Sequence, residues 1–506
     1  MSLMRVKPLD QILATAEKRS LKRQLGAFSL MMLGIGAIIG TGIFVLTAVA
    51  AQKAGPGMMY SFVIAGLVCA LTALVYAEIA AMVPVAGSAY TYSYAVLGEL
   101  IAWMVGWALI LEYAVAASAV AVGWSGYANE FLNHTDLWGL VKEGSLSLPA
   151  TLQVGPMIQG AHGTFNLVAF LISLAVTWLL VAGTSKSAKF TSVLVMVKII
   201  ALTLFIIIAF PVATTHPENF KPMLPNGWGT PLSGVGVLGA AASIFFAFVG
   251  FDAVSTASEE TTNPNRNIPI GLIGSLAICT VFYLLVAYTA VGAEGAQPGG
   301  PLSQAKDPLA FILREINHPL MAKLVGSAAI LALPSVVLMM IFGQTRILFT
   351  MARDGLMPRA FAKVHPRYHT PHVVTMITGG AVAVFAALFN VDLLADISNA
   401  GTLFAFFAVA LGVMVLRVKQ PDRPRPFRTP LVWVVGPLAM AGCTLLFFSL
   451  GWNPTIKFFC YWAVGGLVVY FLFSRRSSAL APGNAPIDAE KLEPTPLVHE
   501  GPEPGP

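Results

Sequence analysis

The stretch Gly34-Ile-Gly-Ala-Ile-Ile-Gly-Thr-Gly-Ile-Phe44 decides the fold, because it is too apolar for a loop and too rich in glycine for an ordinary helix. Each glycine disfavours a helix by about 1 kcal/mol relative to alanine, yet residues 27 to 51 around it are long and apolar. The pattern predicts a membrane helix that is interrupted near its middle. An interruption leaves backbone N–H and C=O groups unpaired inside the bilayer, where each costs several kcal/mol. We therefore expect polar groups of the chain, or a polar ligand, to meet this break.

The composition indicates a membrane protein with many spans. Of the 506 residues, 57% are hydrophobic and only 11% are charged, too few charges for a soluble globular protein of this length. The formal net charge is +6, but the basic residues lie between apolar segments, so membrane topology explains them better than a nucleic-acid partner does. All four cysteines fall in apolar stretches without metal-ligand spacing. We expect them to pack as small hydrophobic side chains, and we expect no metal site.

About twelve apolar segments have the length needed to cross a bilayer. They cover residues 27–51, 59–83, 98–131, 165–183, 188–211, 233–258, 268–292, 319–353, 371–390, 396–417, 430–449 and 454–474. No small-residue cleavage site follows the basic segment 1–26, which predicts a retained first helix rather than a signal peptide. Basic residues gather in that segment and in alternate connections, so both termini are expected in the cytoplasm. A short interfacial helix is expected within 1–26, and disorder in the tail, 475–506.

A second interrupted span predicts internal symmetry. In the sixth span, Gly250 and Asp252 interrupt an otherwise apolar run. Breaks in the first and sixth spans correspond to each other if the chain consists of two halves of five spans, and such paired breaks are typical of binding sites in secondary transporters. We therefore expect an all-α polytopic protein with five-helix halves at 27–211 and 233–417 and two additional helices at 430–474. In the alternative, the glycines only allow close helix packing.

Four motifs together resemble those of the amino acid-polyamine-organocation superfamily. They are Gly36-Ala-Ile-Ile-Gly-Thr-Gly-Ile-Phe44, Pro84-Val-Ala-Gly-Ser-Ala-Tyr-Thr-Tyr-Ser-Tyr94, Gly106-Trp-Ala-Leu-Ile-Leu-Glu-Tyr113, and Phe246-Ala-Phe-Val-Gly-Phe-Asp-Ala253 with Glu259-Glu260. More narrowly, residues 25 to 475 are similar to the bacterial relatives of the cationic amino acid transporters. The resemblance implies the inverted-repeat fold named for the leucine transporter LeuT, which agrees with the two predicted halves.

The resemblance also implies a function. It favours a secondary active transporter of the cytoplasmic membrane that imports neutral, alanine-like amino acids, cationic amino acids, or both, by alternating access. A proton gradient would drive import, and no cofactor would be needed. Two alternatives stay open, an amino acid exchanger and a membrane nutrient sensor without flux. The sequence contains no recognisable nucleophile–base pair and no phosphate-binding loop, so it does not favour an enzyme. Besides the amino acid and the lipid bilayer, the one partner still considered is a small single-span membrane protein.

The resemblance places the substrate at the two breaks. The α-carboxylate would meet backbone N–H groups around Gly40, Thr41 and Gly42, since free donors at a half-helix N-terminus attract an anion. The α-ammonium would meet backbone carbonyl groups of four residues, namely Ile38, Phe246, Ala247 and Val249. Phe246 would also close the site toward the outside, unless it is an ordinary core aromatic.

Specificity depends on the residues around the substrate side chain. The resemblance puts Met339 on the face of the eighth span that looks toward the side-chain pocket. Because this methionine is bulky and no carboxylate is aimed into the pocket, small neutral amino acids are expected to fit at least as well as arginine. In the alternative, Met339 is ordinary packing.

Three ionisable residues inside the spans need an explanation. Lys198 lies about 15 Å from either end of its helix, where a charged lysine costs about 2.5 to 3.5 kcal/mol on insertion scales. The resemblance implies that a lysine on the fifth span replaces a sodium ion beside the first break. We therefore expect Lys198 to donate to carbonyl groups near Gly36 and Ala37 and to couple transport to protons, with permanent structural pairing as the alternative. Glu112 and Asp252 are further candidates for the pathway, each with a structural role as the alternative.

Overall fold

The computed structural model describes residues 5–9, 25–85, 87–133, 148–157, 163–183, 188–365 and 370–481. These residues form helices and no strand, apart from one isolated parallel bridge between Leu25 and Thr261. The all-helical prediction is confirmed for this part of the chain. The interfacial helix predicted within 1–26, and the disorder predicted for the tail, fall mostly outside the described residues.

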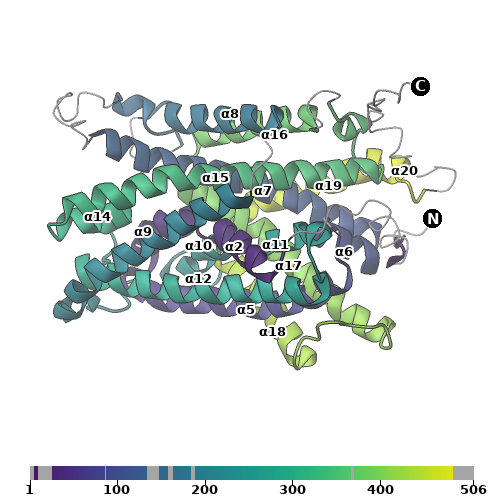
Figure 1. Ribbon diagram of the computed structural model, residues 1–506, viewed down its shortest axis with the longest axis horizontal. Helices are drawn as coiled ribbons and strands as arrows, with labels where there is room; N and C mark the ends of the chain where they lie inside the picture. Colours follow the sequence, from purple (N-terminus) through teal and green to yellow (C-terminus); the bar gives the residue numbers. More distant parts are fainter. Residues whose placement is uncertain are drawn as a thin grey trace, which may run out of the picture.

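The long helices run roughly along one direction and form a bundle (Figure 1). The first part of the chain forms α2 (Ala27–Ile38), α3 (Thr41–Phe44), α4 (Leu46–Ala54), α5 (Met58–Met82), α6 (Ser88–Val96), α7 (Glu99–Asn133), α8 (Leu167–Val181) and α9 (Ala188–Thr215). The second part forms α10 (Gly236–Phe248), α11 (Ala253–Thr256), α12 (Pro264–Glu294), α13 (Pro301–Gln304), α14 (Pro308–Glu315), α15 (Pro319–Arg353), α16 (His372–Leu388), α17 (Val391–Lys419), α18 (Val432–Ser449), α19 (Lys457–Val469) and α20 (Arg475–Ser477). Each apolar segment predicted above carries at least one of these helices.

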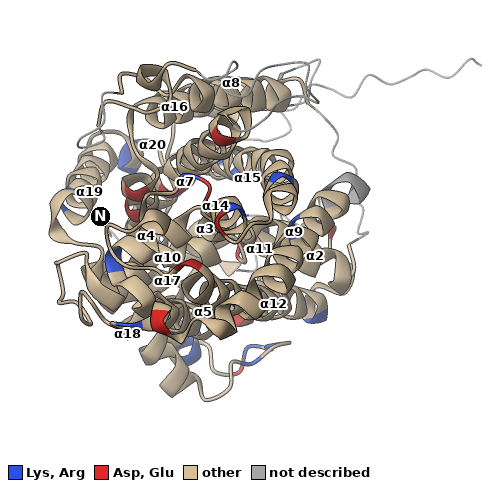
Figure 2. Cartoon of the chain, turned by 90° about the vertical axis from the view of Figure 1, so that its left-hand side faces the viewer, with Lys and Arg blue, Asp and Glu red and all other residues tan. Residues whose placement is uncertain are grey.

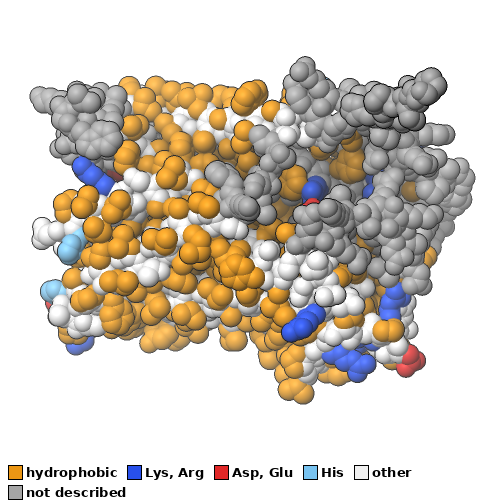
Figure 3. All heavy atoms as spheres, in the orientation of Figure 1, with side chains coloured by type: hydrophobic (Ala, Val, Ile, Leu, Met, Phe, Trp, Pro, Cys, Tyr) orange, Lys and Arg blue, Asp and Glu red, His pale blue; other side chains and the backbone are white. Residues whose placement is uncertain are grey.

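The surface of the bundle suits a lipid environment. Among the described residues, nine helices are long and apolar enough to cross a membrane, and three apolar helices, α2, α8 and α16, are shorter. Hydrophobic side chains cover the middle of the face in Figure 3, and the few charged ones lie away from that middle. Trp178 of α8, for example, is 72% exposed. Three cysteines are buried as expected, whereas Cys460 is exposed. The chain is therefore a multi-pass membrane protein, while the count of twelve spans stays a prediction.

Ion pairs tie helices together at both ends of the bundle, which we call the α14 end and the α20 end after the helices that mark them in Figure 1. At the α20 end, Lys7 Nζ lies 2.9 Å from Asp354 Oδ1, and the Ala479 N–H donates to the Asp354 carbonyl at 3.0 Å. At the α14 end, Lys53 Nζ lies 2.7 Å from Asp396 Oδ2. Segments near the start and the end of the described chain therefore meet at one residue, Asp354.

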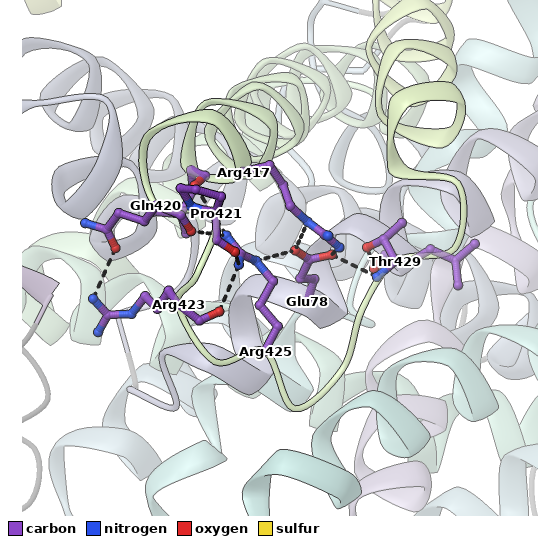
Figure 4. A network of polar contacts seen from close by, with 9 residues as sticks. Glu78, Arg417, Gln420, Pro421, Arg423, Arg425 and Thr429 are labelled. Carbon is purple, nitrogen blue, oxygen red and sulfur yellow. Dashed lines mark hydrogen bonds and ion pairs between the residues drawn. The ribbon is translucent and has the colours of Figure 1, made fainter.

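A buried network holds the connection between α17 and α18 at the α20 end (Figure 4). Glu78 of α5 accepts hydrogen bonds from Arg417 Nε and Nη2 at 2.7 and 2.8 Å and from the Thr429 N–H at 2.8 Å. Arg425 Nε lies 3.2 Å from the same carboxylate, and its Nη2 donates to the Gln420 carbonyl at 2.7 Å. One carboxylate therefore faces two guanidinium groups and joins α5 to α17 and to the loop that follows it.

Candidate substrate site

Two interrupted helices supply the centre of the candidate site. After α2, Ile39 is extended (φ −71°, ψ 97°), and the chain resumes as α3 two residues later. After α10, Val249 is extended (φ −63°, ψ 138°), and α11 follows at Ala253. Both interruptions fall within the stretches in which the glycines predict them. Figure 2 shows α3 and α10 near the middle of the bundle, surrounded by the other helices.

Glycine allows the two interruptions to touch through their backbones. A Cβ atom at Gly42 would collide with the backbone of Ala247 in α10. Gly250 has φ +120°, which side-chain-bearing residues rarely adopt, and a Cβ there would lie 2.9 Å from the carbonyl carbon of Ala37. Gly42 and Gly250 are therefore the positions at which only glycine permits this close approach.

A small cavity lies between the interruptions. Six of the predicted contact residues line it, namely Ile38, Gly40, Thr41, Gly42, Phe246 and Val249. Val120 of α7 and Val336 of α15 add apolar walls. The cavity volume is about 10 Å³, which is room for about one water molecule. The cavity is too small for an amino acid, so its lining would have to move apart to admit one.

Two predicted contact residues lie elsewhere. Ala247 does not line the cavity, although its backbone packs against Gly42. Met339 is half-buried and also does not line it, whereas its neighbour Met340 does. Adjacent residues of an α-helix point about 100° apart, so an offset of one residue moves the side chain to another face. Met340, and not Met339, is the methionine that lines the cavity.

Polar groups at the first interruption lack partners. The Thr41 side chain is fully buried, and its Oγ1 has no hydrogen-bond partner among the described residues. The Phe44 N–H donates to the Gly40 carbonyl at 3.3 Å, whereas the N–H groups that precede it in α3 have no acceptor within their own helix. An unsatisfied buried polar group costs about 1 to 3 kcal/mol. A ligand with an acceptor oxygen at this point would therefore give the Thr41 hydroxyl a partner.

Tyr283 of α12 links the two interruptions and was not predicted from the sequence. Its hydroxyl lies 2.8 Å from the Ile38 carbonyl and 2.9 Å from the Ala247 carbonyl. A hydroxyl has one proton to donate, so the two carbonyl groups share it. The one available signal was a tyrosine in the middle of an apolar span, which is too common to single out a residue.

Lys198 of α9 contacts the first interrupted helix from another side. Its side chain is fully buried, and Nζ donates to the Gly36 carbonyl at 2.8 Å. Gly36 permits the contact between α2 and α9, because a Cβ there would lie 2.6 Å from Val195 Cγ2. Of the two carbonyl groups that the sequence prediction named, the one at Gly36 is the acceptor in the structure.

The two buried carboxylates of the central region lie on different helices. Asp252, just after the second interruption, accepts a hydrogen bond from the Tyr113 hydroxyl at 3.3 Å. Glu112 of α7 is 2% exposed, and its Oε2 has no partner among the described residues. Neither residue lines the cavity. Asp252 therefore has an identifiable structural contact, while Glu112 keeps one unsatisfied oxygen.

A polar cluster at the α14 end was also missed in the sequence, where Lys53 counted only toward topology. Lys53 Nζ donates to Ser243 Oγ at 2.6 Å and pairs with Asp396, whose carboxylate also accepts from Ser243. The cluster joins the end of α4, the second half of α10 and the start of α17, so it ties both interrupted helices to α17. No spacing in the sequence connects these three residues.

Comparison with known proteins identifies the family. A family model described as amino acid permease matches residues 25–473. The chain is 46% identical over 472 residues to the branched-chain amino acid permease BcaP of Bacillus subtilis (strain 168), covering 93% of this chain and 97% of that protein. It is 42% identical over 480 residues to the methylthioribose transporter of the same organism, covering 95% and 99%.

A eukaryotic relative is more distant. The chain is 35% identical over 430 residues to the vacuolar cationic amino acid transporter 2 of Arabidopsis thaliana, covering 84% of this chain and 65% of that protein. The match to the family model and the similarity along nearly the whole length of two bacterial transporters identify a transporter, not an enzyme. The chain belongs to the amino acid permease family of the amino acid-polyamine-organocation superfamily.

Proposed function

We propose that this protein imports amino acids across the cytoplasmic membrane by alternating access, driven by a proton gradient. The observation that carries the proposal is the cavity between the two interruptions, where the buried Thr41 hydroxyl has no hydrogen-bond partner among the described residues and the first N–H groups of α3 have no acceptor within their own helix. In an amino acid zwitterion the carboxylate, which accepts, and the ammonium group, which donates, are attached to the same Cα atom, so one molecule can satisfy broken-helix donors and acceptors together.

The proposal includes a LeuT-type architecture with twelve spans. The five-helix halves would cover 27–211 and 233–417, followed by the two additional helices at 430–474. The contact between the two interruptions supports this arrangement, because corresponding broken helices of inverted halves meet at the binding site. The α20 end would face the cytoplasm, together with the segments 1–26 and 475–506.

In the bound state, the α-carboxylate would accept hydrogen bonds from the backbone around Gly40, Thr41 and Gly42. The α-ammonium would donate to carbonyl groups of Phe246 and Val249. The carbonyl groups of Ile38 and Ala247 already accept from Tyr283, so we assign to Tyr283 the task of holding the two interruptions at a fixed separation. Phe246 would close the site toward the α14 end.

The side-chain preference follows from the apolar wall. Val120, Val336 and Met340 line the cavity, and none of its described lining residues carries a carboxylate. An apolar pocket without a counter-charge favours a neutral aliphatic side chain over a guanidinium or an ammonium group. The name of the Bacillus subtilis branched-chain permease agrees with this choice. Shortening Met340 to alanine should admit longer side chains.

Lys198 is the proposed proton site. A lysine without a carboxylate partner in a buried position changes its charge easily. In its charged form it would hold the Gly36 carbonyl firmly, and loss of the proton would weaken that hydrogen bond and release the first interrupted helix. Coupling would follow because the two states of α2 would bind the substrate differently.

The test uses proteoliposomes with an inward proton gradient and labelled leucine or alanine. Wild-type uptake should rise with the gradient, and competition by a panel of amino acids should rank neutral aliphatic side chains first. Lys198→Met should lose the gradient dependence, whereas the exposed control Lys457→Met should keep it. Gradient-driven uptake by Lys198→Met would remove the coupling role. Uptake by wild type that requires an amino acid inside the vesicles, and not a gradient, would establish exchange instead of symport.

A further inference from the structure

A groove opens on the surface of the bundle at the α20 end, and we call it the α12 groove. Its volume is about 530 Å³, which is in the range of small-molecule sites. One wall is the start of α12, and the other is the connection between α17 and α18, residues 420–431. The lining residues on which the argument depends are Asn265, Arg266, Ile270, Ile273, Gly274 and Phe427.

One half of the α12 groove is apolar. Ile270 is 39% exposed, and Phe427 is half-buried in the opposite wall. Arg266, Ile270 and Gly274 follow one another at intervals of four residues, so they lie on one face of α12. The helix rises about 12 Å from Arg266 to Gly274, a length that accommodates part of a lipid acyl chain.

The other half of the groove carries unpaired polar groups. Arg266 and Asn265 are exposed, and neither side chain makes a hydrogen bond or ion pair with the described residues. Arg428, directly after Phe427, is also exposed and without such a partner in the described part of the chain. Figure 3 shows Lys and Arg side chains gathered at the lower right, where Figure 1 places the connection between α17 and α18.

The buried carboxylate at this corner does not balance the positive charge. Glu78 already pairs with Arg417 and Arg425. Burial and the charge of Arg417 lower the pKa of Arg425, while the carboxylate raises it and the charge of Arg428 lowers it further. Positive charge is therefore in excess beside the groove, and an anion from outside the chain is the complementary partner.

The two halves lie at different depths in the membrane. α12 begins at Pro264 and is long and apolar enough to cross the bilayer. Asn265 and Arg266 therefore lie where the span meets the headgroups, and Ile270 and Ile273 lie one to two turns deeper. A basic pocket at the headgroup level, with an apolar surface below it, suits the head and the chains of a phospholipid.

We propose that the α12 groove binds an anionic phospholipid from the leaflet at the α20 end. The lipid phosphate accepts hydrogen bonds from Arg266 and Asn265, and an acyl chain lies along Ile270 and Phe427. A choline headgroup would bring a positive charge toward Arg428, so an uncharged headgroup on the phosphate is preferred. The proposal needs only a membrane-spanning chain and does not depend on which substrate is transported.

The bound lipid would rest on a helix that supports the first interruption. A Cβ at Gly271 of α12 would lie 2.8 Å from Leu30 Cβ, and one at Gly274 would lie 2.7 Å from Met31 Sδ. α12 therefore packs closely on α2 beside the groove. Since a ligand that binds only the folded protein stabilises it, the lipid should raise the melting temperature.

The test measures the melting temperature of the full-length protein in one detergent with added phosphatidylglycerol or phosphatidylcholine of the same acyl chains. Phosphatidylglycerol should raise it more. Arg266→Gln should need about five times more phosphatidylglycerol for half of the shift, the effect of about 1 kcal/mol for one basic residue near a membrane surface. Arg266→Lys should restore most of the affinity. Arg359→Gln, an exposed arginine outside the groove, should behave as wild type.

Two further arms identify the ligand and its place. Glycerol phosphate, which lacks acyl chains, should give no shift, and a phosphatidylglycerol with a photoreactive acyl chain should label the start of α12 or the connection at Phe427. Equal shifts by the two lipids, equal lipid requirements of Arg266→Gln and Arg359→Gln, or labelling spread evenly over the exposed helices would overturn the lipid site. A full shift by glycerol phosphate would show a site for a free anion and overturn it as well. Each of these results leaves the proposed transport function intact, and absence of uptake would leave the lipid site intact.

Discussion

The Glu78 network gives a prediction whose size follows from the structure. Glu78→Gln removes the one carboxylate that faces both Arg417 and Arg425. The side chains of Glu78 and Arg425 are each 1% exposed, so water cannot replace the lost charge. Breaking a buried pair by removing one partner costs about 3 to 5 kcal/mol. With an unfolding entropy of about 2.1 cal/mol/K per residue, a chain of 506 residues loses about 1 °C of melting temperature per kcal/mol.

We therefore expect Glu78→Gln to melt about 3 to 5 °C below wild type, measured in one detergent by the loss of the monodisperse peak on gel filtration after heating. Asp422→Asn is the matched control, since this exposed acid lies in the same loop and makes no hydrogen bond or ion pair with the described residues. The double variant Glu78→Gln/Arg417→Gln should lose less than the sum of the single losses, because each single change strands a charge that the double change removes. A melting temperature equal to that of Asp422→Asn, or strictly additive losses, would refute the reasoning.

Two further predictions concern the centre of the bundle. Gly42→Ala should reduce uptake at least tenfold and the free energy of unfolding by about 1 to 3 kcal/mol, because its methyl group would meet the Ala247 backbone. Gly380→Ala is the control and should change neither quantity, since a Cβ there meets nothing within 4 Å. Wild-type uptake by Gly42→Ala would contradict the close approach of the two interruptions. Tyr283→Phe should lower uptake, because it leaves two buried carbonyl groups without the tyrosine donor. An unsatisfied buried polar group costs about 1 to 3 kcal/mol of stability. Tyr288→Phe on the same helix is its control, and equal uptake by the two variants would remove the role of Tyr283.

The sequence predicts the interruptions because their cause is local. Glycine content and an intramembrane carboxylate change backbone preferences within a few residues, and this effect is visible without knowledge of neighbours. For the same reason the lysine at position 198 could be singled out, since its cost depends only on depth in an apolar span. The residues Ile38, Gly40, Thr41 and Gly42 line the cavity because they are the interruption itself.

Contacts between distant segments could not be predicted in this way. Tyr283 is one tyrosine among many in apolar spans, and only the crossing of α12 over both interruptions gives its hydroxyl a role. The resemblance put Met339 at the side-chain pocket, whereas Met340 lines the cavity. Which of these two neighbours faces inward depends on the rotation of α15 about its axis, and the sequence pattern of a helix that is buried on several sides does not fix that rotation. The pairing of Lys53 with Asp396 spans 343 residues and depends on the tertiary fold alone.

The small volume of the central cavity also governs how binding measurements should be read. When only a fraction of molecules has an open site, the apparent dissociation constant equals the intrinsic one divided by that fraction. If one molecule in about 100 is open, the apparent affinity is weaker by about 2.8 kcal/mol than that of the open form. Tighter binding by a variant is then no evidence of a new contact with the ligand, because a change anywhere in the bundle that makes the open form more common has the same effect.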